Sequence, residues 1–448
     1  MYDLVIRSGT LVTPHGAMQT DLAIDGGKIA AFEGEISSKQ EVDASKKLIF
    51  PGIIDAHTHM ALPVSGTRSS DDFFTGTRAA ACGGVTTIVD FTVGTRETTI
   101  IADIESRREA AQPAGVDYSF HAEVIGWNPS REGEIREAIA LGVKTFKFYT
   151  AYATSGRQSD AGDLCHAFRV LAKLNGTALV HCEDEEIINS ILNQMSAAER
   201  ANMANLAVTR PSICEQTAIS KVANTAKSTG AKVHIVHVSS GLGLAVVMRT
   251  RKQGAKLTAE TCPQYLLLDS NVYNRKDGHL FSAAPPLRTE EDQVQLWEGL
   301  VNGALDLVAT DHCPFTRKQK MWQGSFLDLP YGLPGVETLL PLLYSEGVVK
   351  GRIPITAIPR LLCEGPARIN GLYPRKGTLS IGSDADLVIF DPKKEWMIHA
   401  KDLHMATDFS PYEGVGVRGA VEMTISRGRV VYADGQFQGE RGWGQFIV

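Results

Sequence analysis

Eight apolar segments with strand-like composition recur through the middle of the sequence, and amphipathic helical patterns fill most of the gaps between them. The segments span residues 53–59, 84–92, 117–124, 143–150, 177–184, 232–239, 256–265 and 306–313. Strands that alternate with helices favour a parallel sheet, and eight of them favour a closed (β/α)8 TIM barrel. An open doubly wound sheet is the alternative, but no Gly-x-Gly-x-x-Gly phosphate loop follows the first segment.

Both ends of the chain differ from this middle part, because they contain short alternating strands and turn residues. The first 50 residues include an expected hairpin turn at Gly26-Gly27. The same character recurs near the other end, in residues 377–392 and 421–435 and in the final GQFIV. Neither end has enough apolar residues to be stable alone. We therefore expect residues 1–50 and 377–448 to form one small β-sandwich domain, and residues 51–376 to form the barrel as the catalytic domain.

Composition and charge exclude several classes of protein. The 448 residues are 43% hydrophobic and 21% charged, as in soluble globular proteins. A net charge of −6 gives no electrostatic case for binding nucleic acid or an anionic membrane, and no apolar run approaches the ~20 residues of a membrane span. The chain starts without a signal-like segment, and its seven scattered cysteines contain no Cys-x-x-Cys pair. We therefore expect a cytoplasmic protein without disulfide bonds or a thiolate zinc site.

Metal-ligating side chains occur where several of the expected strands end. His57 and His59 lie two residues apart, so alternation along a strand places both imidazoles on one face. In a (β/α)8 barrel, the carboxyl ends of the strands meet at one mouth and carry the chemistry. The candidates that meet there are His57, His59, Lys147, His181, His237 and Asp311. A single histidine at a strand end is more often structural, but this many candidates at one end predict a metal site.

Position along the strands separates these candidates from nearby histidines. His234 lies three residues before His237, so it faces the other way, and we expect a structural role for it. His312 follows Asp311 directly and should point away from the metal. His121 in the third segment stays open between a residue that hydrogen-bonds to a ligand and a packed residue.

Lys147 is the unusual member of the set, because it lies between Phe146 and Phe148. Burial and nearby cations both favour its neutral amine over the ammonium. A neutral amine can add carbon dioxide and become a carbamate, whose two oxygens could bridge two metal ions. The alternative is a lysine that is ion-paired with a carboxylate.

Several motifs of this sequence together resemble the cyclic amidohydrolases, and above all their hydantoinase and dihydropyrimidinase branch. The motifs are DAHTH (55–59), FKFYTAY (146–152), VHCED (180–184), VHVSS (236–240), ETCPQYLLLD (260–269), APPLR (284–288), ATDHCPF (309–315) and GSDADLVIFDP (382–392). The resemblance covers nearly the whole chain. It implies a barrel flanked by a β-sandwich, a binuclear zinc centre bridged by a hydroxide and a carboxylated lysine, and a homotetramer or a homodimer.

The same resemblance implies a role for each candidate. The more buried zinc would be held by His57, His59 and Asp311, the more exposed one by His181 and His237, and both would be bridged by carboxylated Lys147. A hydroxide between the metals would attack a ring carbonyl of a cyclic amide. Asp311 would pass the proton of the hydroxide to the leaving ring nitrogen, and Tyr152 would donate its hydroxyl to the developing oxyanion. The alternative for Tyr152 is a packed aromatic residue in the loop.

The substrate that this resemblance implies is a 5-substituted hydantoin or a dihydropyrimidine, which ring opening converts to an N-carbamoyl amino acid. Tyr152 is similar to the tyrosine of dihydropyrimidinases and D-selective hydantoinases. Ala284 and Tyr331 depart from the family pattern, which often has Ser and Asn there, but both positions are expected to hold the ring through backbone groups. We expect Met60, Leu62 and Val64 to line an apolar pocket for the 5-substituent. The alternative is that they pack against the barrel or a partner subunit.

Two other functions stay open from the sequence. One is an allantoinase or another hydrolase of cyclic imides or ureides, or a single-metal deaminase, although the lysine between two phenylalanines favours two metals. The other is a non-enzymatic interaction protein similar to the collapsin response mediator proteins, which share this architecture but have lost metal-site residues. All the ligand positions are filled in this chain, so we expect an enzyme.

Overall fold

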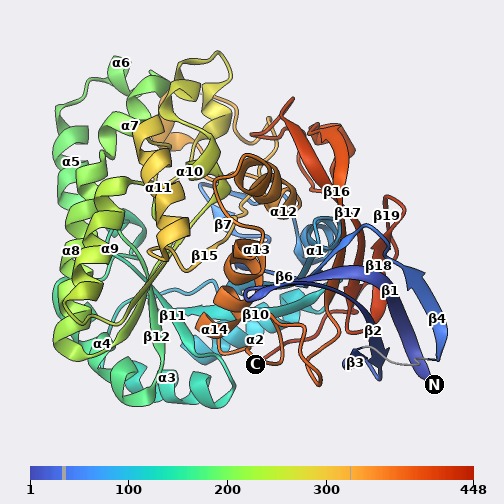
Figure 1. Ribbon diagram of the computed structural model, residues 1–448. Helices are drawn as coiled ribbons and strands as arrows, with labels where there is room; N and C mark the ends of the chain where they lie inside the picture. The colour runs from blue at the N-terminus through green and yellow to red at the C-terminus, as the bar shows by residue number, and fades with distance from the viewer. Residues whose placement is uncertain (33–36, 323) are drawn as a thin grey trace.

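The computed structural model describes residues 1–32, 37–322 and 324–448, and it contains a parallel barrel (Figure 1). The barrel strands are β6 (Ile53–Thr58), β9 (Val85–Phe91), β10 (Asp117–Glu123), β11 (Thr145–Tyr149), β12 (Thr177–His181), β13 (Lys232–Ile235), β14 (Leu257–Thr261) and β15 (Leu307–Val308). They pair in the order β15-β14-β13-β12-β11-β10-β9-β6, and each pair is parallel. The edges meet beyond the strand ends, where the N–H of His59 donates to the carbonyl of His312 at 2.8 Å. The predicted (β/α)8 barrel is confirmed.

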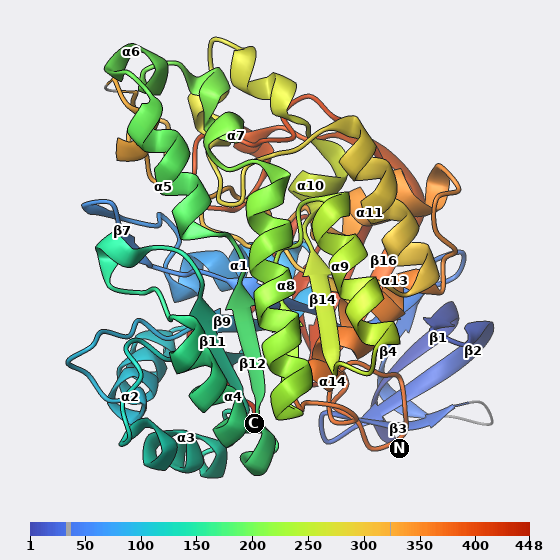
Figure 2. The ribbon, with the colours of Figure 1, turned by 90° about the vertical axis from the view of Figure 1, so that its left-hand side faces the viewer.

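Helices cover the outside of the barrel, and Figure 2 shows α8 and α9 in front of strands β12 and β14. The main helices are α1 (Phe73–Cys82), α2 (Ile100–Ala111), α3 (Arg131–Ala140), α4 (Ala161–Leu174), α8 (Ser212–Thr229), α9 (Gly241–Lys252) and α11 (Glu290–Asn302). In α4, the Asp160 side chain caps the first turn by accepting from the N–H of Asp163. Leu164, Phe168 and Leu171 are buried on the one face that the helical period turns toward the strands.

Shorter elements form the remaining connections. They are β7 (Pro63–Val64), β8 (Thr67–Arg68), α5 (Glu185–Gln194), α6 (Ala197–Arg200), α7 (Leu206–Thr209), α10 (Pro263–Leu267), α12 (Leu339–Leu342), α13 (Ala357–Pro359) and α14 (Gly365–Ile369). Figure 2 shows α5, α6 and α7 beyond the carboxyl end of β12, on the side of the barrel that carries the site. Among the described residues, no helix is both long and apolar enough to cross a bilayer.

The two ends of the chain meet in one nine-stranded sheet beside the barrel (Figure 1). Its strands are β1 (Tyr2–Thr13), β2 (Gly16–Asp25), β3 (Lys28–Phe32), β4 (Ser38–Asp43), β5 (Leu48–Pro51), β16 (Leu387–Met397), β17 (Gly416–Ser426), β18 (Arg429–Ala433) and β19 (Gln436–Phe437). Strand β5 from the first end pairs with β16 from the second, with Ile49 opposite Ile389. The expected pairing of the two ends is therefore observed. Gly26 and Gly27 form the turn between β2 and β3 with φ of 55° and 75°.

The last residues of the chain differ from the expectation that they continue this sheet. The carbonyl of Gln445 accepts from the N–H of Tyr118, and the N–H of Ile447 donates to the carbonyl of Tyr118. Ile447 is fully buried and clusters with Ile54 and Leu307, which lie near the starts of their barrel strands. The segment therefore covers the amino-terminal end of the barrel, because its apolar side chains are buried there rather than on the sheet.

Candidate metal centre and active site

Three of the predicted ligands converge at the mouth of the barrel, beyond the ends of β6 and β15. The Nε2 atoms of His57 and His59 lie 3.2 and 3.1 Å from the same carboxylate oxygen of Asp311. His57 lies in β6, His59 follows it, and Asp311 follows β15 in a left-handed backbone conformation with φ of 54°. Two imidazole nitrogens and a carboxylate oxygen this close together form a ligand set that suits a divalent metal ion such as zinc.

Glu260 in β14 orients this first ligand set. One of its carboxylate oxygens contacts His57 Nδ1 at 2.5 Å, and the other contacts His234 Nε2 at 3.0 Å. The contact with Nδ1 fixes the His57 ring so that Nε2 faces Asp311. Burial opposes ionisation of Glu260, yet His57 and His234 lower its pKa well below the usual range. His234 therefore supports Glu260 from the opposite side, in the structural role expected for it.

The charges around His57 also fit a bound cation. Burial alone would lower the pKa of His57, but Glu260 and Asp311 outweigh burial and raise that pKa to about 9. The two carboxylates thus create a negative field at a buried imidazole. A divalent cation would neutralise that field and take the place of the proton on His57.

His181 and His237 form a second ligand set at the ends of β12 and β13. His181 Nδ1 lies 3.0 Å from His237 Nε2, so these two nitrogen atoms point toward a common position. His181 Nε2 contacts Glu183 at 2.9 Å, which leaves Nδ1 free to bind a metal when Nε2 carries the proton. The centroids of the His237 and His57 rings are 5.5 Å apart, so the second set adjoins the first. The pair suits a second metal ion.

Lys147 in β11 is buried between aromatic rings, with 2% of its surface exposed. Its Nζ lies 5.0 Å from the centre of the Phe91 ring and 5.1 Å from that of Tyr149. In the described part of the chain no carboxylate forms an ion pair with this amine, so the ion-paired alternative is not observed. Burial lowers the pKa of Lys147 to about 8, although the nearby charges of Asp311 and Glu260 raise it in part. Neutral amine is therefore available near neutral pH, as carbamate formation requires.

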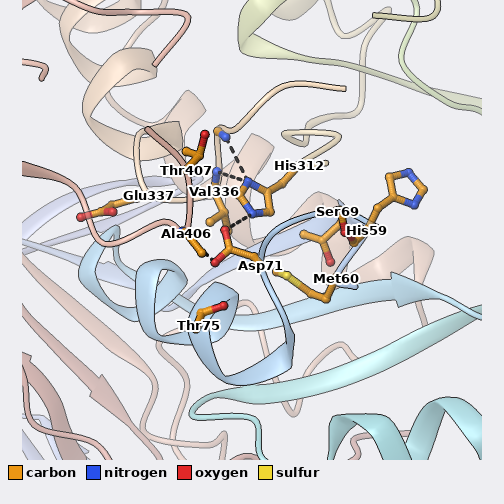
Figure 3. A network of polar contacts seen from close by, with 12 residues as sticks. His59, Met60, Ser69, Asp71, Thr75, His312, Val336, Glu337, Ala406 and Thr407 are labelled. Carbon is orange, nitrogen blue, oxygen red and sulfur yellow. Dashed lines mark hydrogen bonds and ion pairs between the residues drawn. The ribbon is translucent and has the colours of Figure 1, made fainter. Parts of the chain in front are cut away.

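A hydrogen-bond network behind the first ligand set joins loops that are far apart in the sequence (Figure 3). His312 points away from the ligands, as predicted, and its Nε2 contacts Asp71 at 3.1 Å. Its Nδ1 accepts from the backbone N–H groups of Gly335 and Val336. Asp71 also accepts from the N–H of Ala406 at 3.0 Å. These donors assign the neutral tautomer of His312 that carries its proton on Nε2.

Tyr152 lies in the loop after β11, in a left-handed backbone conformation with φ of 75°. Its N–H donates to Glu185 at 2.7 Å, and its ring centroid lies 4.9 Å from that of His181. Burial raises the pKa of Tyr152 above its usual range, so the hydroxyl keeps its proton and can act as a donor. Tyr152 is thus positioned beside the second ligand set.

The two loops that contain Ala284 and Tyr331 lie side by side. The N–H of Gly332 donates to the carbonyl of Ser282 at 2.9 Å. The Tyr331 hydroxyl donates to the carbonyl of Phe326 at 3.0 Å, which holds its ring within its own loop. Ala284 and Tyr331 are both partly exposed.

The loop after β6 does not present all three predicted apolar residues to the site. Met60 is fully buried and packs against Gly76 of α1, and Figure 3 shows its side chain pointing away from the His59 ring. Of the two alternatives that the sequence left open for Met60, its burial favours packing inside the protein, because alternation continues past β6 and turns Met60 toward the helices. Leu62 and Val64 are partly exposed near the hairpin of β7 and β8.

His121 is a packed residue, which settles the choice left open by the sequence. Its Nδ1 contacts the Thr145 hydroxyl at 2.8 Å, and its Nε2 contacts the carbonyl of Ala56 at 2.9 Å. Both nitrogens are therefore used inside the barrel. Burial lowers the pKa of His121 to about 3, so the ring stays neutral.

Glu260 and the pair formed by Glu183 and Arg210 contact the predicted site residues, but the sequence did not predict a role for them. Arg210 forms an ion pair with Glu183, and its guanidinium lies 5.5 Å from the Tyr152 ring and 6.0 Å from the Tyr331 ring. The position of Glu260 near the carboxyl end of β14 could have indicated a role at the site, because the candidate ligands lie at the same ends of other strands. Arg210 lies in a loop where no periodic pattern predicts its position.

The fold and the site define a class of protein, namely (β/α)8 barrel enzymes that gather metal ligands at the carboxyl ends of their strands. The chain belongs to the amidohydrolase family, whose model matches residues 48–431.

Known relatives are similar to this chain over its whole length. A D-phenylhydantoinase from Escherichia coli O1:K1 / APEC is 40% identical, over 99% of this chain and 97% of the relative. The crystal structure of dihydropyrimidinase from Brevibacillus agri NCHU1002 matches with a TM-score of 0.97 at 34% identity, over 99% of this chain and 98% of that chain. The L-hydantoinase (dihydropyrimidinase) from Arthrobacter aurescens matches with a TM-score of 0.92 at 30% identity and 100% coverage of both.

Proposed function

We propose that this protein hydrolyses a cyclic amide, a 5-substituted hydantoin or a dihydropyrimidine, to an N-carbamoyl amino acid. The observation that carries the proposal is the convergence of two ligand sets on one mouth of the barrel together with a buried lysine. The relatives named D-phenylhydantoinase and dihydropyrimidinase support the same class of substrate.

The residues present fit two divalent metal ions, which we propose to be zinc. One would be held by His57, His59 and Asp311, the other by His181 and His237, with Lys147 between them. The neutral amine of Lys147 would form an N–C bond to carbon dioxide and release one proton to solvent, which gives a carbamate with two ligand oxygens. Bound metal ions supply a hydroxide nucleophile at neutral pH and polarise the ring carbonyl.

Asp311 and Tyr152 would handle the proton and the developing charge. Burial opposes ionisation of Asp311, but His57 and His59 hold its pKa well below the usual range, so it is a carboxylate at neutral pH. It would accept a proton from the nucleophile and give that proton to the ring nitrogen as the C–N bond breaks. The Tyr152 hydroxyl would donate to the carbonyl oxygen as that oxygen gains negative charge.

The loops that contain Ala284 and Tyr331 lie side by side. Their backbone N–H and carbonyl groups would hold the amide ring. Leu62 and Val64, both partly exposed, would border the 5-substituent. This arrangement favours an apolar 5-substituent, aromatic or alkyl, and the partly exposed Tyr331 ring could stack on an aryl group.

We also propose that the protein is a cytoplasmic homotetramer, or else a homodimer. Exposed apolar side chains on the outer helices support an interface: Ile213 on α8, Leu242 on α9, and Val294 and Val301 on α11 are 44–58% exposed. Light scattering during gel filtration should give the mass of two or four chains, and a monomer at micromolar concentration would contradict this proposal.

A parallel assay of four ring substrates tests the proposed function. We expect zinc-replete protein to open phenylhydantoin or dihydrouracil much faster than allantoin or a cyclic imide. His181→Asn serves as the control, because it keeps the fold but removes a ligand nitrogen, so any activity it retains would come from a contaminant. No turnover of either expected substrate by metal-replete protein would contradict the proposal.

A further inference from the structure

Lys320 is a fully buried lysine in a turn whose neighbouring side chains face solvent. Arg317, Lys318 and Met321 are exposed, whereas Lys320 has no exposed surface. Burial lowers the pKa of Lys320 to about 7, which reflects the cost of removing an ammonium from water. In the part of the chain that is described, no carboxylate forms an ion pair with this amine. Groups other than carboxylates must therefore hold Lys320 in its buried position.

Those partners are three oxygen atoms of one loop. The Nζ of Lys320 donates to the carbonyls of Leu280 and Ser282 and to the Ser282 hydroxyl, each at 3.0 Å. The three N–H donors of an ammonium match three acceptors. The centroids of the Phe315 and Phe409 rings also lie 5.9 and 6.0 Å from Nζ.

Ser282 also joins this loop to the loop of Tyr331. Its carbonyl accepts from the N–H of Gly332 at 2.9 Å, and its hydroxyl donates to the carbonyl of Pro330 at 3.2 Å. A side chain at Gly332 is excluded, because a Cβ would lie 2.4 Å from the carbonyl oxygen of Cys313. Ser282 therefore connects Lys320 to the backbone of both loops.

The residue next to Lys320 ties the same turn to the hairpin of β7 and β8. The Gln319 side-chain amide donates to the Thr67 hydroxyl at 2.9 Å and to the carbonyl of Arg68 at 2.7 Å. One turn thus contacts the loop before Ala284 and the β7–β8 hairpin directly, and it reaches the loop of Tyr331 through Ser282.

We propose that Lys320 is a positioning residue for substrate binding, which fixes the backbone of residues 282–284 and 330–332 so that both loops grip the amide ring. This inference rests on the proposed function. Lys320 contacts one ring-binding loop directly and the other through Ser282, and it does not contact the metal ligands, so its loss should weaken binding more than it slows the chemical step.

Lys320→Met tests the inference, because methionine fills similar space without donors. We expect KM for a hydantoin substrate to rise about tenfold, as for one lost charge-assisted hydrogen bond, while kcat and zinc content change less than about threefold. Amide hydrogen exchange should accelerate in peptides that cover residues 278–286 and 328–334, and not in the barrel strands. Lys318→Met is the matched control in the exposed part of the same turn, and it should change neither readout.

The inference is overturned if KM and loop exchange in Lys320→Met equal those of the control, or if exchange accelerates evenly through the whole chain. If Lys320→Met does not fold, Ser282→Ala replaces it, since it removes the hydroxyl that links Lys320 to the carbonyl of Pro330. Unchanged KM and unchanged exchange in that variant would equally overturn the inference. Because exchange needs no turnover, a wild-type protein that opens no cyclic amide would refute the proposed function, while loop exchange would still decide the role of Lys320.

Discussion

Asp71 and His312 lie 241 positions apart in the sequence, yet a carboxylate oxygen of Asp71 is 3.1 Å from His312 Nε2, and both side chains are fully buried. His312 follows Asp311, and its carbonyl accepts from the N–H of His59 at 2.8 Å. The pair therefore holds the two backbone segments that present His59 and Asp311 to a common position. Figure 3 shows the contact between Asp71 and His312.

Replacing Asp71 should loosen the first ligand set. In Asp71→Ala, the ring Nε2–H of His312 and the backbone N–H of Ala406 lose their acceptor inside the protein. This loss should lower the free energy of unfolding by about 2–4 kcal/mol. Urea unfolding of the apo protein measures this loss, and competition with a chelator should show weaker metal binding. Asp402→Asn, at an exposed position, is the control. An Asp71→Ala protein as stable as this control would contradict the role given to the pair.

Tyr152→Phe should keep its metal and lose rate. Removal of a donor to a developing oxyanion typically lowers turnover by about 10²–10³. We expect kcat to fall by that order while zinc content stays at the wild-type level, since the Tyr152 ring lies against His181 without binding through its oxygen. Near-full turnover in this variant would show that Tyr152 is only a packed aromatic residue.

Lys147→Ala should lose metal, because the variant cannot form a carbamate. Short carboxylates such as acetate or propionate, added during reconstitution with zinc, should restore part of the metal and part of the activity by occupying the same space. Elemental analysis with and without the added acid measures the effect. An alanine variant that is fully metallated without any added carboxylate would refute the bridging role.

Asp103 should make stability depend on pH away from the metal centre. Burial raises its pKa to about 6, while the Thr98 hydroxyl donates to it at 3.1 Å. The folded state therefore binds more protons than the unfolded state between about pH 4 and 6, so stability falls as pH rises through this range. Asp103→Asn cannot titrate, so its stability should not fall in this way. Between pH 5 and pH 7, its free energy of unfolding should rise by about 1 kcal/mol relative to that of wild type. A constant difference in Tm over that range would contradict the assignment.

The sequence predicted the barrel and the ligands for one physical reason, which is that strand ends of a parallel barrel share one mouth. His57, His181, His237 and Asp311 all lie at such ends, so their convergence followed from the topology. The same alternation that places His57 and His59 together turns Met60 into the core, which is the second of the two alternatives that the sequence left open for it.

Other features depend on contacts that no local pattern carries. Glu260 orients His57 from a strand far along the chain, and Arg210 reaches its position from the loop between α7 and α8. The last residues cover the bottom of the barrel because Ile447 is buried there, although their composition equally suits an edge strand. Contacts between residues far apart in the sequence therefore determine these positions, which the alternation of side chains along one strand does not predict.

The metal content of wild-type protein, produced with zinc and bicarbonate, tests the central claim most directly. Elemental analysis should find two zinc ions per chain, and His57→Asn and His237→Asn should each lose about one of them while the protein stays folded. A wild-type chain without bound metal under these conditions, or variants that keep the full complement, would contradict the account of the site.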